Sequence, residues 1–200
     1  MRSCMNKKII VVFDFDGTLT TKDTLLEFVK FCFGTRRLCI GLFCFLPLIF
    51  LMKLGVYSNW KCKQKFFSWF YKDMEYEKFK ELGRLFAKKA CSLLKDGVVE
   101  EIQRFQKGNA YTYIVSASVE DWVAPVASCL KVDKVLGTKV EVNSEGKLTG
   151  FFSTENCYGQ EKVNRFLKEE PNRDEYYLYA YGDSRGDKEM IAFADEGFWV

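Results

Sequence analysis

The sequence predicts an α/β protein whose mostly parallel sheet is interrupted, after its first strand, by a helical insert. Residues 9–13 form a run of β-branched and aromatic side chains that is typical of a strand buried on both faces. Beyond residue 110, strand-like and helix-like segments alternate, as they do in proteins built from strand-helix-strand units. Between residues 22 and 92 the sequence shows no strand pattern, so we expect this segment to be helical.

The predicted first strand runs directly into two acidic residues, Asp14 and Asp16. Because side chains alternate along a strand, we expect both carboxylates on the same side, with Phe15 opposite. Gly17 then allows the backbone to turn sharply and to bring its amides close to a ligand. Two carboxylates held so close repel each other unless a cation lies between them, so this turn is a candidate cation site. The alternative is an acidic turn exposed to solvent.

The insert is predicted to contain about four helices. Thr24 and Glu27 have the spacing of a capping box, which indicates a helix that begins near Thr24 and ends around Gly34. Two amphipathic helices are expected further along, over residues 60–71 and 76–90. We expect their aromatic side chains to form a core.

Between Leu38 and Met52 lies an uninterrupted run of 15 apolar residues, flanked by basic residues. As a helix it would be about 22 Å long, shorter than the roughly 30 Å of a bilayer's hydrocarbon core, and Pro47 would kink it. We therefore expect a helix that is buried in the protein or rests on a membrane surface. A helix that crosses the membrane is the alternative.

The second half of the chain resumes the alternation of strands and helices. Ser118 and Asp121 have capping-box spacing, so the strand before them should pass quickly into a helix. Parallel strands bind ligands beyond their carboxyl ends, which makes the polar turns after the strands the candidate site. The expected elements are a helix over residues 96–107, a strand over 110–116, a helix from about 118, a hairpin with arms 139–142 and 147–152, a helix from about 158, a strand over 176–181 and a helix through Ala194.

The composition excludes several kinds of site. The sequence has no histidine, which removes Ser-His and Cys-His nucleophiles and His-ligated metals. Its eight cysteines include no CxxC pair and follow no secretory leader, so we expect reduced thiols and a cytoplasmic protein. Residues 22–95 carry 15 Lys/Arg and six Asp/Glu, a net charge of +9. Such a region could attract an anionic metabolite, an anionic membrane surface or nucleic acid, although a solvated helical surface is the commonest reason for such an excess. Neither a basic arm nor a nucleic-acid motif is present, so we expect no nucleic-acid partner.

Polar turns follow three of the predicted strands, and a lysine opens a later helix. Carboxylates hold a hard cation, amides and a lysine hold phosphate oxygens, and one carboxylate can serve as a nucleophile. The set therefore matches magnesium-assisted transfer of a phosphoryl group. Its members are Asp14, Asp16, Ser116, Lys162, Asp183 and Asp187.

In this combination and order, the residues resemble the haloacid dehalogenase (HAD) superfamily of phosphatases. Residues 14–20 resemble its first motif, residues 114–118 its second, Lys162 its third and residues 182–187 its fourth. The helical segment between the first two motifs is similar to the cap of subfamily IB, which includes phosphoserine phosphatase.

The resemblance implies a division of the chain into two domains. Residues 1–20 and 93–200 would form a Rossmann-like HAD core that carries the chemistry. Residues 21–92 would form an all-helical C1-type cap, inserted after the first strand.

The resemblance also implies a role for each site residue. Asp14 would attack phosphorus and form an aspartyl-phosphate, while Asp16 would act first as general acid and then as general base. Mg²⁺ would be held by Asp14, Asp183 and the backbone carbonyl of Asp16. Asp187 would support that site. The substrate would be bound by Thr18, Asp23, Ser116, Ala117 and Lys162.

Some residues depart from the phosphoserine phosphatase pattern. Asp23 stands where those enzymes carry a glutamate, and Gly186 replaces an asparagine. Residues 116–118, Ser-Ala-Ser, replace Ser-Gly-Gly. The early apolar run is similar to that of bacterial phosphatidylglycerophosphate phosphatases (phosphatidylglycerophosphatase C-like), which are less characterised relatives.

We therefore predict a phosphoric monoester hydrolase that uses Mg²⁺ and acts on a small anionic metabolite, phosphoserine-like substrates included. The alternative is a membrane-associated phosphatase of a lipid phosphate, with the segment from Leu38 to Met52 in the bilayer. A module that only binds phosphate or Mg²⁺ is disfavoured, because binding alone does not require Asp16. The substrate's identity, the oligomeric state and the choice between hydrolysis and phosphotransfer are left open.

Overall fold

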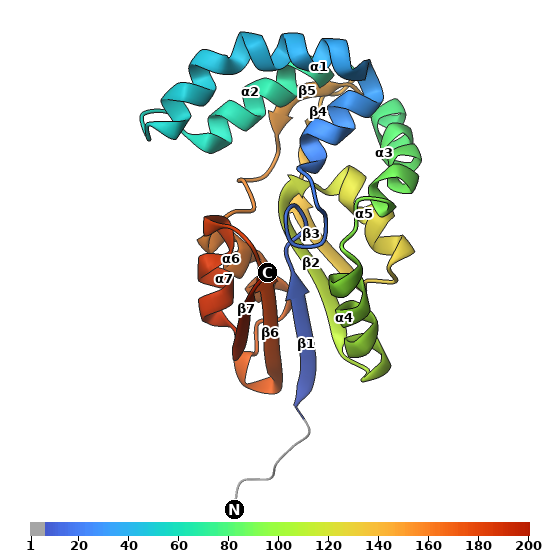
Figure 1. Cartoon of the computed structure of the whole chain (residues 1–200), viewed down its shortest axis with the longest axis vertical. Coiled ribbons are helices and arrows are strands. Elements are labelled where there is room, and N and C mark those ends of the chain that lie inside the picture. The colour runs from blue at the N-terminus through green and yellow to red at the C-terminus, as the bar shows by residue number, and fades with distance from the viewer. Residues whose placement is uncertain (1–6) are drawn as a thin grey trace, which may run out of the picture.

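The structure, a computed structural model that describes residues 7–200, is built on a five-stranded sheet whose neighbouring strands are all parallel (Figure 1). The strand order is β3-β2-β1-β6-β7. The predicted α/β fold with a mostly parallel, Rossmann-like sheet is therefore confirmed, while the first six residues of the predicted core lie outside the described range. The strands are β1 (Lys8–Phe13), β2 (Tyr111–Val119), β3 (Lys134–Thr138), β6 (Tyr176–Gly182) and β7 (Glu196–Trp199).

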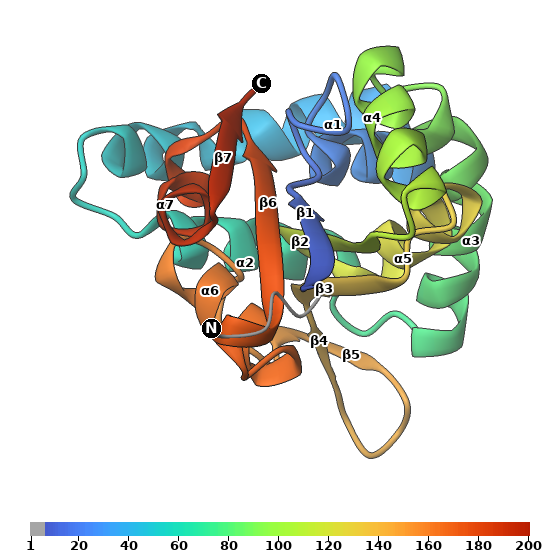
Figure 2. The same ribbon diagram turned by 90° about the horizontal axis from the view of Figure 1, so that it is seen from below.

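β1 lies at the centre of the sheet because its apolar side chains are buried on both faces. Val11 and Phe13 belong to the apolar cluster that includes α4 and α5, whereas Ile10 and Val12 belong to a second cluster with α6 and α7. Figure 2 shows these two pairs of helices on opposite sides of the sheet. The helices are α4 (Asp96–Lys107), α5 (Glu120–Cys129), α6 (Gln160–Glu169) and α7 (Lys188–Phe193), with short 3₁₀ turns at Arg173–Glu175 and Arg185–Asp187.

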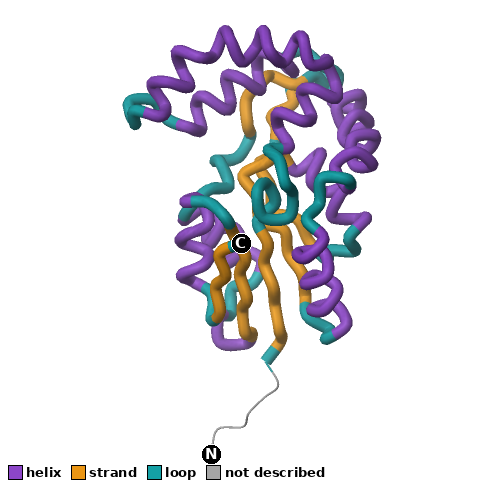
Figure 3. Tube along the Cα trace, viewed as in Figure 1, coloured by secondary structure: helices purple, strands orange, loops and turns teal. Residues whose placement is uncertain are grey.

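The insert consists of α1 (Thr24–Lys53), α2 (Asn59–Tyr71) and α3 (Tyr76–Cys91) and lies across the carboxyl ends of the strands (Figures 1 and 3). α1 breaks at Gly34, whose φ of 81° and ψ of 162° are not helical, and a second helical segment then runs to Lys53. The predicted helix end at Gly34 is thus confirmed. Gly34 is the one residue within α1 with non-helical φ/ψ, so the helix continues through Pro47, and the kink expected there stays a prediction. Pro47 lies on the exposed side of α1, where a carbonyl that loses its intrahelical donor can bind water.

Among residues 7–200, α1 is the one helix long and apolar enough to cross a membrane, judged by length and composition. Its first segment is nevertheless part of the protein's interior, since Phe28 is fully buried and its ring stacks on Tyr71 at 5.6 Å between centroids. Phe28 also meets the ring of Trp122 in α5, at 4.9 Å. Aromatic packing therefore joins the insert to the core.

The predicted hairpin is present as β4 (Val140–Val142) and β5 (Leu148–Phe152), and it packs on the insert. The ring of Phe152 lies 5.1 Å from that of Phe67 in α2. The backbone N–H of Asp73 donates to the carbonyl of Leu148 at 2.8 Å. The hairpin, which lies within the predicted core segment 93–200, thus completes the apolar face of α2. The division into core and cap at residues 20 and 93 stays a prediction.

The two ends of the insert meet in a short neck, formed by residues 19–21 and 93–95. Thr20 pairs with Leu94 in an antiparallel bridge. The N–H of Thr21 donates to the carbonyl of Leu93, and the N–H of Lys95 to the carbonyl of Leu19, each at 2.8 Å. The chain therefore leaves the core and returns to it at the same place.

Four details of the predicted elements differ from the structure. The N-cap of α1 is Asp23, so the capping box predicted at Thr24 is wrong, although the helix does begin there. α5 begins at Glu120 after Val119, with no side-chain cap, so the capping box predicted at Ser118 is wrong. Ser118 instead donates its hydroxyl hydrogen to Asp16. The edge strands β3 and β7 were not predicted from the sequence.

Candidate active site

The candidate site is a pocket of about 380 Å³ between the carboxyl ends of the strands and the underside of the insert. The turn after β1, the carboxyl end of β2 and the start of α6 contribute polar residues to its lining. Figure 3 shows the loops that converge between the strands and the helices above them. Among the predicted residues, the pocket is lined by Asp14, Asp16, Asp23, Ser116, Ala117 and Lys162.

The turn after β1 is held tightly against the turn after β6. The backbone N–H of Asp14 donates to the carbonyl of Tyr181 at 2.9 Å, which continues the pairing of the two strands. Gly17 has a φ of 84°, and a Cβ placed there would lie 2.2 Å from Oδ2 of Asp183. A side chain at this position would therefore separate the two turns. Thr18 donates its hydroxyl hydrogen to Oδ1 of Asp183 at 3.2 Å, so Thr18 lies beside the predicted phosphate site and not among the pocket-lining residues.

Lys162 joins two of the carboxylates at the buried end of the pocket. Its Nζ lies 2.5 Å from Oδ1 of Asp14 and 2.5 Å from Oδ1 of Asp187, and the side chain of Lys162 is only 3% exposed. Burial lowers the pKa of Lys162, but the two carboxylates outweigh it and raise that pKa above its ordinary value. Burial raises the pKa of Asp14 to about 7, although Lys162 opposes the shift. The lysine thus stays charged beside a carboxylate that is partly desolvated.

A cluster of three carboxylates provides a candidate metal site. Asp14, Asp183 and Asp187 each offer an oxygen, and these oxygens all lie within 4.8 Å of one another. Asp187 is oriented by Ser184, whose N–H and hydroxyl donate to its Oδ2 at 2.9 Å and 2.7 Å. Oxygen donors in this number suit a hard divalent cation such as Mg²⁺. The donor set therefore fits the predicted cofactor.

The carboxylate of Asp16 does not join this cluster. Its Oδ1 accepts the backbone N–H of Thr24 at 2.7 Å, and its Oδ2 accepts the hydroxyl hydrogen of Ser118. Burial raises the pKa of Asp16, and the nearby charge of Asp23 raises it further. Asp14 and Asp16 thus point into the same pocket from different surroundings, one beside a lysine and one beside neutral donors.

The carboxyl-terminal part of β2 supplies a buried hydroxyl, as the sequence predicted. Ser116 is 1% exposed, and its Oγ accepts the N–H of Ser118 at 3.0 Å. Ala117 follows it in the pocket wall. Asp23 lies on the insert side, where its Oδ1 accepts the N–H of Leu26 at 3.2 Å and caps α1.

Lys63 of α2 is a site residue that the sequence did not reveal. Its Nζ donates to the carbonyl of Ala117 at 2.7 Å, and it lines the pocket. It forms no ion pair with any residue in the described range. Burial lowers the pKa of Lys63, while Asp16, Asp23 and Asp14 oppose that shift from across the pocket. No motif marks this lysine, because only the folding of α2 over the strand ends brings it here.

Other residues at the site were also missed. Lys95 donates to the carbonyl of Gly17 and so holds the acidic turn from the neck. Asn156 lines the pocket, and its buried Oδ1 accepts no hydrogen bond within the described chain. Ser118 was noticed in the sequence, but as a helix cap. Only Ser118 lies within a recognised motif, whereas no sequence pattern marked Lys95 or Asn156.

The wall of the pocket opposite the polar turns is apolar. It is formed by side chains at helical spacing in α1 and by residues of α2 that face the same space. The pocket therefore combines a charged end with a surface suited to a hydrophobic group. The apolar members are Leu25, Leu26, Leu42, Phe45, Ile49, Met52 and Phe66.

Comparisons with known proteins agree with this geometry. A model of the haloacid dehalogenase-like hydrolase family matches residues 11–192. The chain is 34% identical over 198 residues to Protein CicA of Caulobacter vibrioides (strain NA1000 / CB15N). The matched region covers 96% of this chain and 85% of Protein CicA.

Two solved structures share the fold. A protein of unknown function from Bordetella pertussis Tohama I has a TM-score of 0.76 and 16% identity, over 94% of this chain and 87% of that one. A phospho-aspartyl intermediate analogue of phosphoserine phosphatase has a TM-score of 0.63 and 22% identity, over 94% of this chain and 84% of that one.

Proposed function

The chain belongs to the haloacid dehalogenase-like hydrolases, and on this premise we propose that it is a phosphatase that hydrolyses a phosphomonoester through an aspartyl-phosphate. The observation that carries the proposal is the contrast between two carboxylates only two residues apart. Asp14 lies 2.5 Å from the ammonium of Lys162, whereas Asp16 is held by Thr24 and Ser118. Different surroundings suit one carboxylate to act as nucleophile and the other to move protons.

In the first step, a carboxylate oxygen of Asp14 attacks phosphorus, and the bond from phosphorus to the leaving oxygen breaks. Asp16 gives its proton to that oxygen, so the product leaves as a neutral alcohol. In the second step, water attacks phosphorus and gives its proton to Asp16. The bond from phosphorus to Asp14 then breaks, which releases inorganic phosphate and restores both carboxyl groups.

The phosphoryl oxygens would be held by groups already fixed at the buried end of the pocket. Lys162 supplies a charge, Ser116 a hydroxyl and Ala117 a backbone amide, while Thr18 steadies the turn. These donors would stabilise the charge on the phosphoryl group in the transition state. Asp23, on the insert side, would contact the leaving group.

The acidic cluster supports Mg²⁺ as the cofactor. We propose that Asp14, Asp183 and the backbone carbonyl of Asp16 hold it and that Asp187 supports the site. When bound, the cation would neutralise part of the negative charge of the cluster and of the phosphoryl oxygens.

The covalent step is tested with Asp14→Asn. We expect no phosphate release and no labelled protein, because an amide is a very poor nucleophile. Wild type mixed with substrate and quenched in acid should gain the mass of one phosphoryl group, and hydroxylamine should remove it. Asp96→Asn, an exposed aspartate on α4, serves as the control and should behave as wild type. Full turnover by Asp14→Asn would contradict the mechanism.

For the substrate, the first candidate is a small anionic metabolite, phosphoserine-like compounds included. The basic side of the pocket supports it, because Lys63 and Lys162 both line the pocket and would face an anionic substrate. This candidate goes with a cytoplasmic protein.

The second candidate is a lipid phosphate, and one observation favours it. The wall formed by Leu42, Phe45, Ile49 and Met52 offers an apolar leaving group a surface that a polar metabolite would not use. This candidate goes with a protein at a membrane surface. Phosphate release from phosphoserine and from phosphatidylglycerophosphate, compared as kcat/KM, separates the two substrates.

A further inference from the structure

Within the second segment of α1, residues 38–52 are apolar on all sides, yet only one side is covered by protein. Leu38, Gly41 and Phe45 are buried on the inner side, which also lines the pocket. A Cβ placed on Gly41 would lie 2.6 Å from the ring of Phe70, so α1 and α2 pack closely. This side is therefore a fixed part of the insert.

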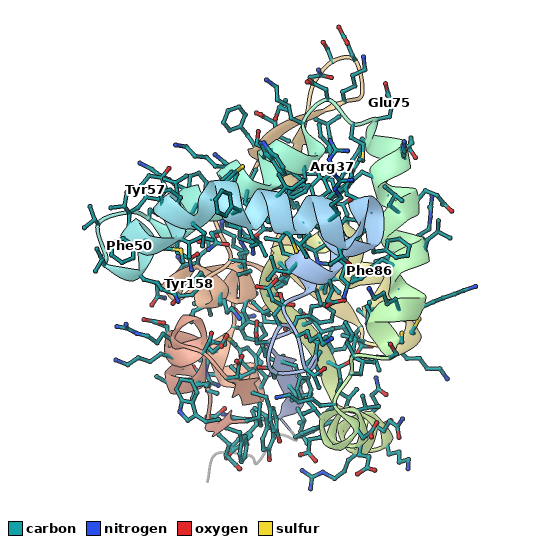
Figure 4. All side chains as sticks on the ribbon, turned by 45° about the horizontal axis from the view of Figure 1, so that its top comes forward. Arg37, Phe50, Tyr57, Glu75, Phe86 and Tyr158 are labelled. Atoms are coloured by element: carbon teal, nitrogen blue, oxygen red, sulfur yellow. The ribbon has the colours of Figure 1, made fainter. Side chains whose placement is uncertain are left out.

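The opposite side carries large apolar side chains that face solvent. Phe43 is 74% exposed and Phe50 is 63% exposed. These residues recur every three or four positions, so they form one continuous stripe along the helix, here called the outer face. Figure 4 shows α1 lying across the surface of the molecule, with Phe50 near one end and Arg37 near the other. The outer face consists of Ile40, Phe43, Leu46, Phe50 and Leu54, with Val56 just beyond the helix.

The part of the sequence that carries the outer face is rich in basic residues and contains no acidic residue. Residues 28–72 contain eight Lys or Arg and no Asp or Glu. Six of the eight are exposed and form no ion pair with any residue between 7 and 200. We call the five of them that lie between residues 36 and 65 the basic rim, namely Arg36, Arg37, Lys53, Lys61 and Lys65. An apolar stripe with a purely cationic border complements an anionic lipid surface.

We propose that the outer face docks on an anionic bilayer, with α1 lying in the plane of the membrane surface. The apolar side chains would enter the boundary between headgroups and acyl chains, and the basic rim would contact the lipid phosphates. A helix that crossed the bilayer would have to give up the contacts of its inner side, including the wall of the pocket. The inference concerns binding and stands whether or not the proposed hydrolysis is correct.

The test is co-sedimentation of the full chain with vesicles. Vesicles of phosphatidylcholine mixed with phosphatidylglycerol should bind the protein, and vesicles of phosphatidylcholine alone should bind it much less. Raising the salt concentration should weaken binding, because the electrostatic part is screened within about 10 Å at 0.1 M salt. Phe43→Glu combined with Phe50→Glu should reduce the partition coefficient at least about tenfold, since two aromatic anchors are lost.

Trp199→Glu is the matched control, because Trp199 is 58% exposed but lies on β7 of the core sheet. It should bind vesicles as wild type does. Folding of each variant is checked by circular dichroism and by hydrolysis of a water-soluble aryl phosphate, since neither Phe43 nor Phe50 lines the pocket. If the double phenylalanine variant fails to fold, Arg36→Glu with Arg37→Glu takes its place and should abolish the preference for anionic vesicles.

Several outcomes would overturn the proposal. Equal binding to both kinds of vesicle, or none to either, would remove the anionic surface as the partner. A dimer of the wild type that the phenylalanine variant dissociates, without vesicle binding, would assign the outer face to a second copy of the chain. Protein that carbonate cannot release from the vesicles would indicate a spanning helix instead. Failure to hydrolyse aryl phosphate would count against the proposed function and leave the vesicle result unaffected.

Discussion

At the scale of single residues, the site depends on how neutral donors hold Asp16. Thr24 and Ser118 fix both oxygens of its carboxylate, and neither belongs to the metal cluster. We predict that Asp16→Asn slows hydrolysis of an alkyl phosphate by about 10²–10⁴-fold, the usual contribution of a general acid. An aryl phosphate, whose leaving group needs little protonation, should lose much less. Steady-state rates on the two substrates check this, and equal losses would argue against the role.

Lys63 is the residue whose removal tests the contribution of the insert to substrate binding. Lys63 lines the pocket, and the hydrogen-bond acceptor of its Nζ is the backbone carbonyl of Ala117. A hydrogen bond to a charged group contributes about 1.5–3 kcal/mol, so Lys63→Met should raise KM about 10- to 100-fold with a smaller change in kcat. Lys63→Arg should recover part of the loss. Lys88→Met on α3, an exposed lysine, is the control; an unchanged KM in Lys63→Met would place this lysine outside the substrate's reach.

At the scale of elements, the two edge strands show what the sequence could not predict. β3 and β7 are short, and each contains a glycine, which breaks a strand pattern. A Cβ on Gly137 would lie 2.9 Å from the Cα of Glu120, and one on Gly197 would lie 2.5 Å from Cγ2 of Ile191. A glycine is therefore needed at both positions, because a helix packs closely on the strand there. This requirement comes from tertiary packing, so a local sequence pattern cannot reveal it.

Close packing between α3 and α5 gives a prediction about stability. A Cβ on Gly83 would lie 2.5 Å from the carbonyl oxygen of Asp121. Gly83→Ala should therefore destabilise the protein by about 1–3 kcal/mol, despite the higher helix propensity of alanine. Gly97→Ala on α4, where a Cβ meets nothing within 4 Å, is the matched control and should be neutral or stabilising. Urea denaturation measures both changes, and a stabilised Gly83→Ala would show that α3 and α5 can separate there.

An ion pair between α1 and α3 predicts a dependence of stability on pH. Lys89 lies 3.0 Å from Oε2 of Glu27 and, with other lysines nearby, lowers the pKa of Glu27. A lowered pKa stabilises the fold above the pKa of the unfolded chain, and the contribution is lost as pH falls through the folded value. Glu27→Gln should therefore lower Tm at neutral pH, because the free energy of unfolding falls by about 0.2–1 kcal/mol. The difference in Tm from wild type should vanish in acid. A difference independent of pH would contradict an electrostatic origin.

At the scale of the whole molecule, the acidic cluster should couple Mg²⁺ binding to folding. Asp14, Asp183 and Asp187 repel one another, and a cation relieves that repulsion. A hundredfold excess of Mg²⁺ over its Kd should stabilise the protein by about 2.7 kcal/mol, which a thermal melt resolves. Asp183→Ala should lose most of this shift and may be compared with Asp174→Ala, on the 3₁₀ turn before β6. A wild-type Tm that does not change in millimolar Mg²⁺ would refute the metal assignment.

The sequence predicted the parallel sheet, the helical insert and the motif residues around the pocket, but not how the insert closes over them. Buried strands and acidic turns are local patterns, so Asp14, Ser116 and Lys162 could be named in advance. Lys63 could not be named in advance, because its position depends on the packing of α2 against the hairpin and the carboxyl end of β2. The inner and outer faces of α1 could not be told apart from the sequence either, because both are apolar and only the packing of neighbouring elements distinguishes them.

The neck has a consequence for how this architecture can vary. Hydrogen bonds join residues 19–21 to residues 93–95, so the two ends of the insert are already closed on each other. Doubling the length of such a closed loop costs only about 0.6 kcal/mol of chain entropy. Loops between Thr21 and Leu93 could therefore lengthen at little entropic cost, provided that the helices that pack on the core keep their contacts. The part of the insert that would contact the leaving group can thus vary during evolution, while the catalytic carboxylates on the core sheet stay in place.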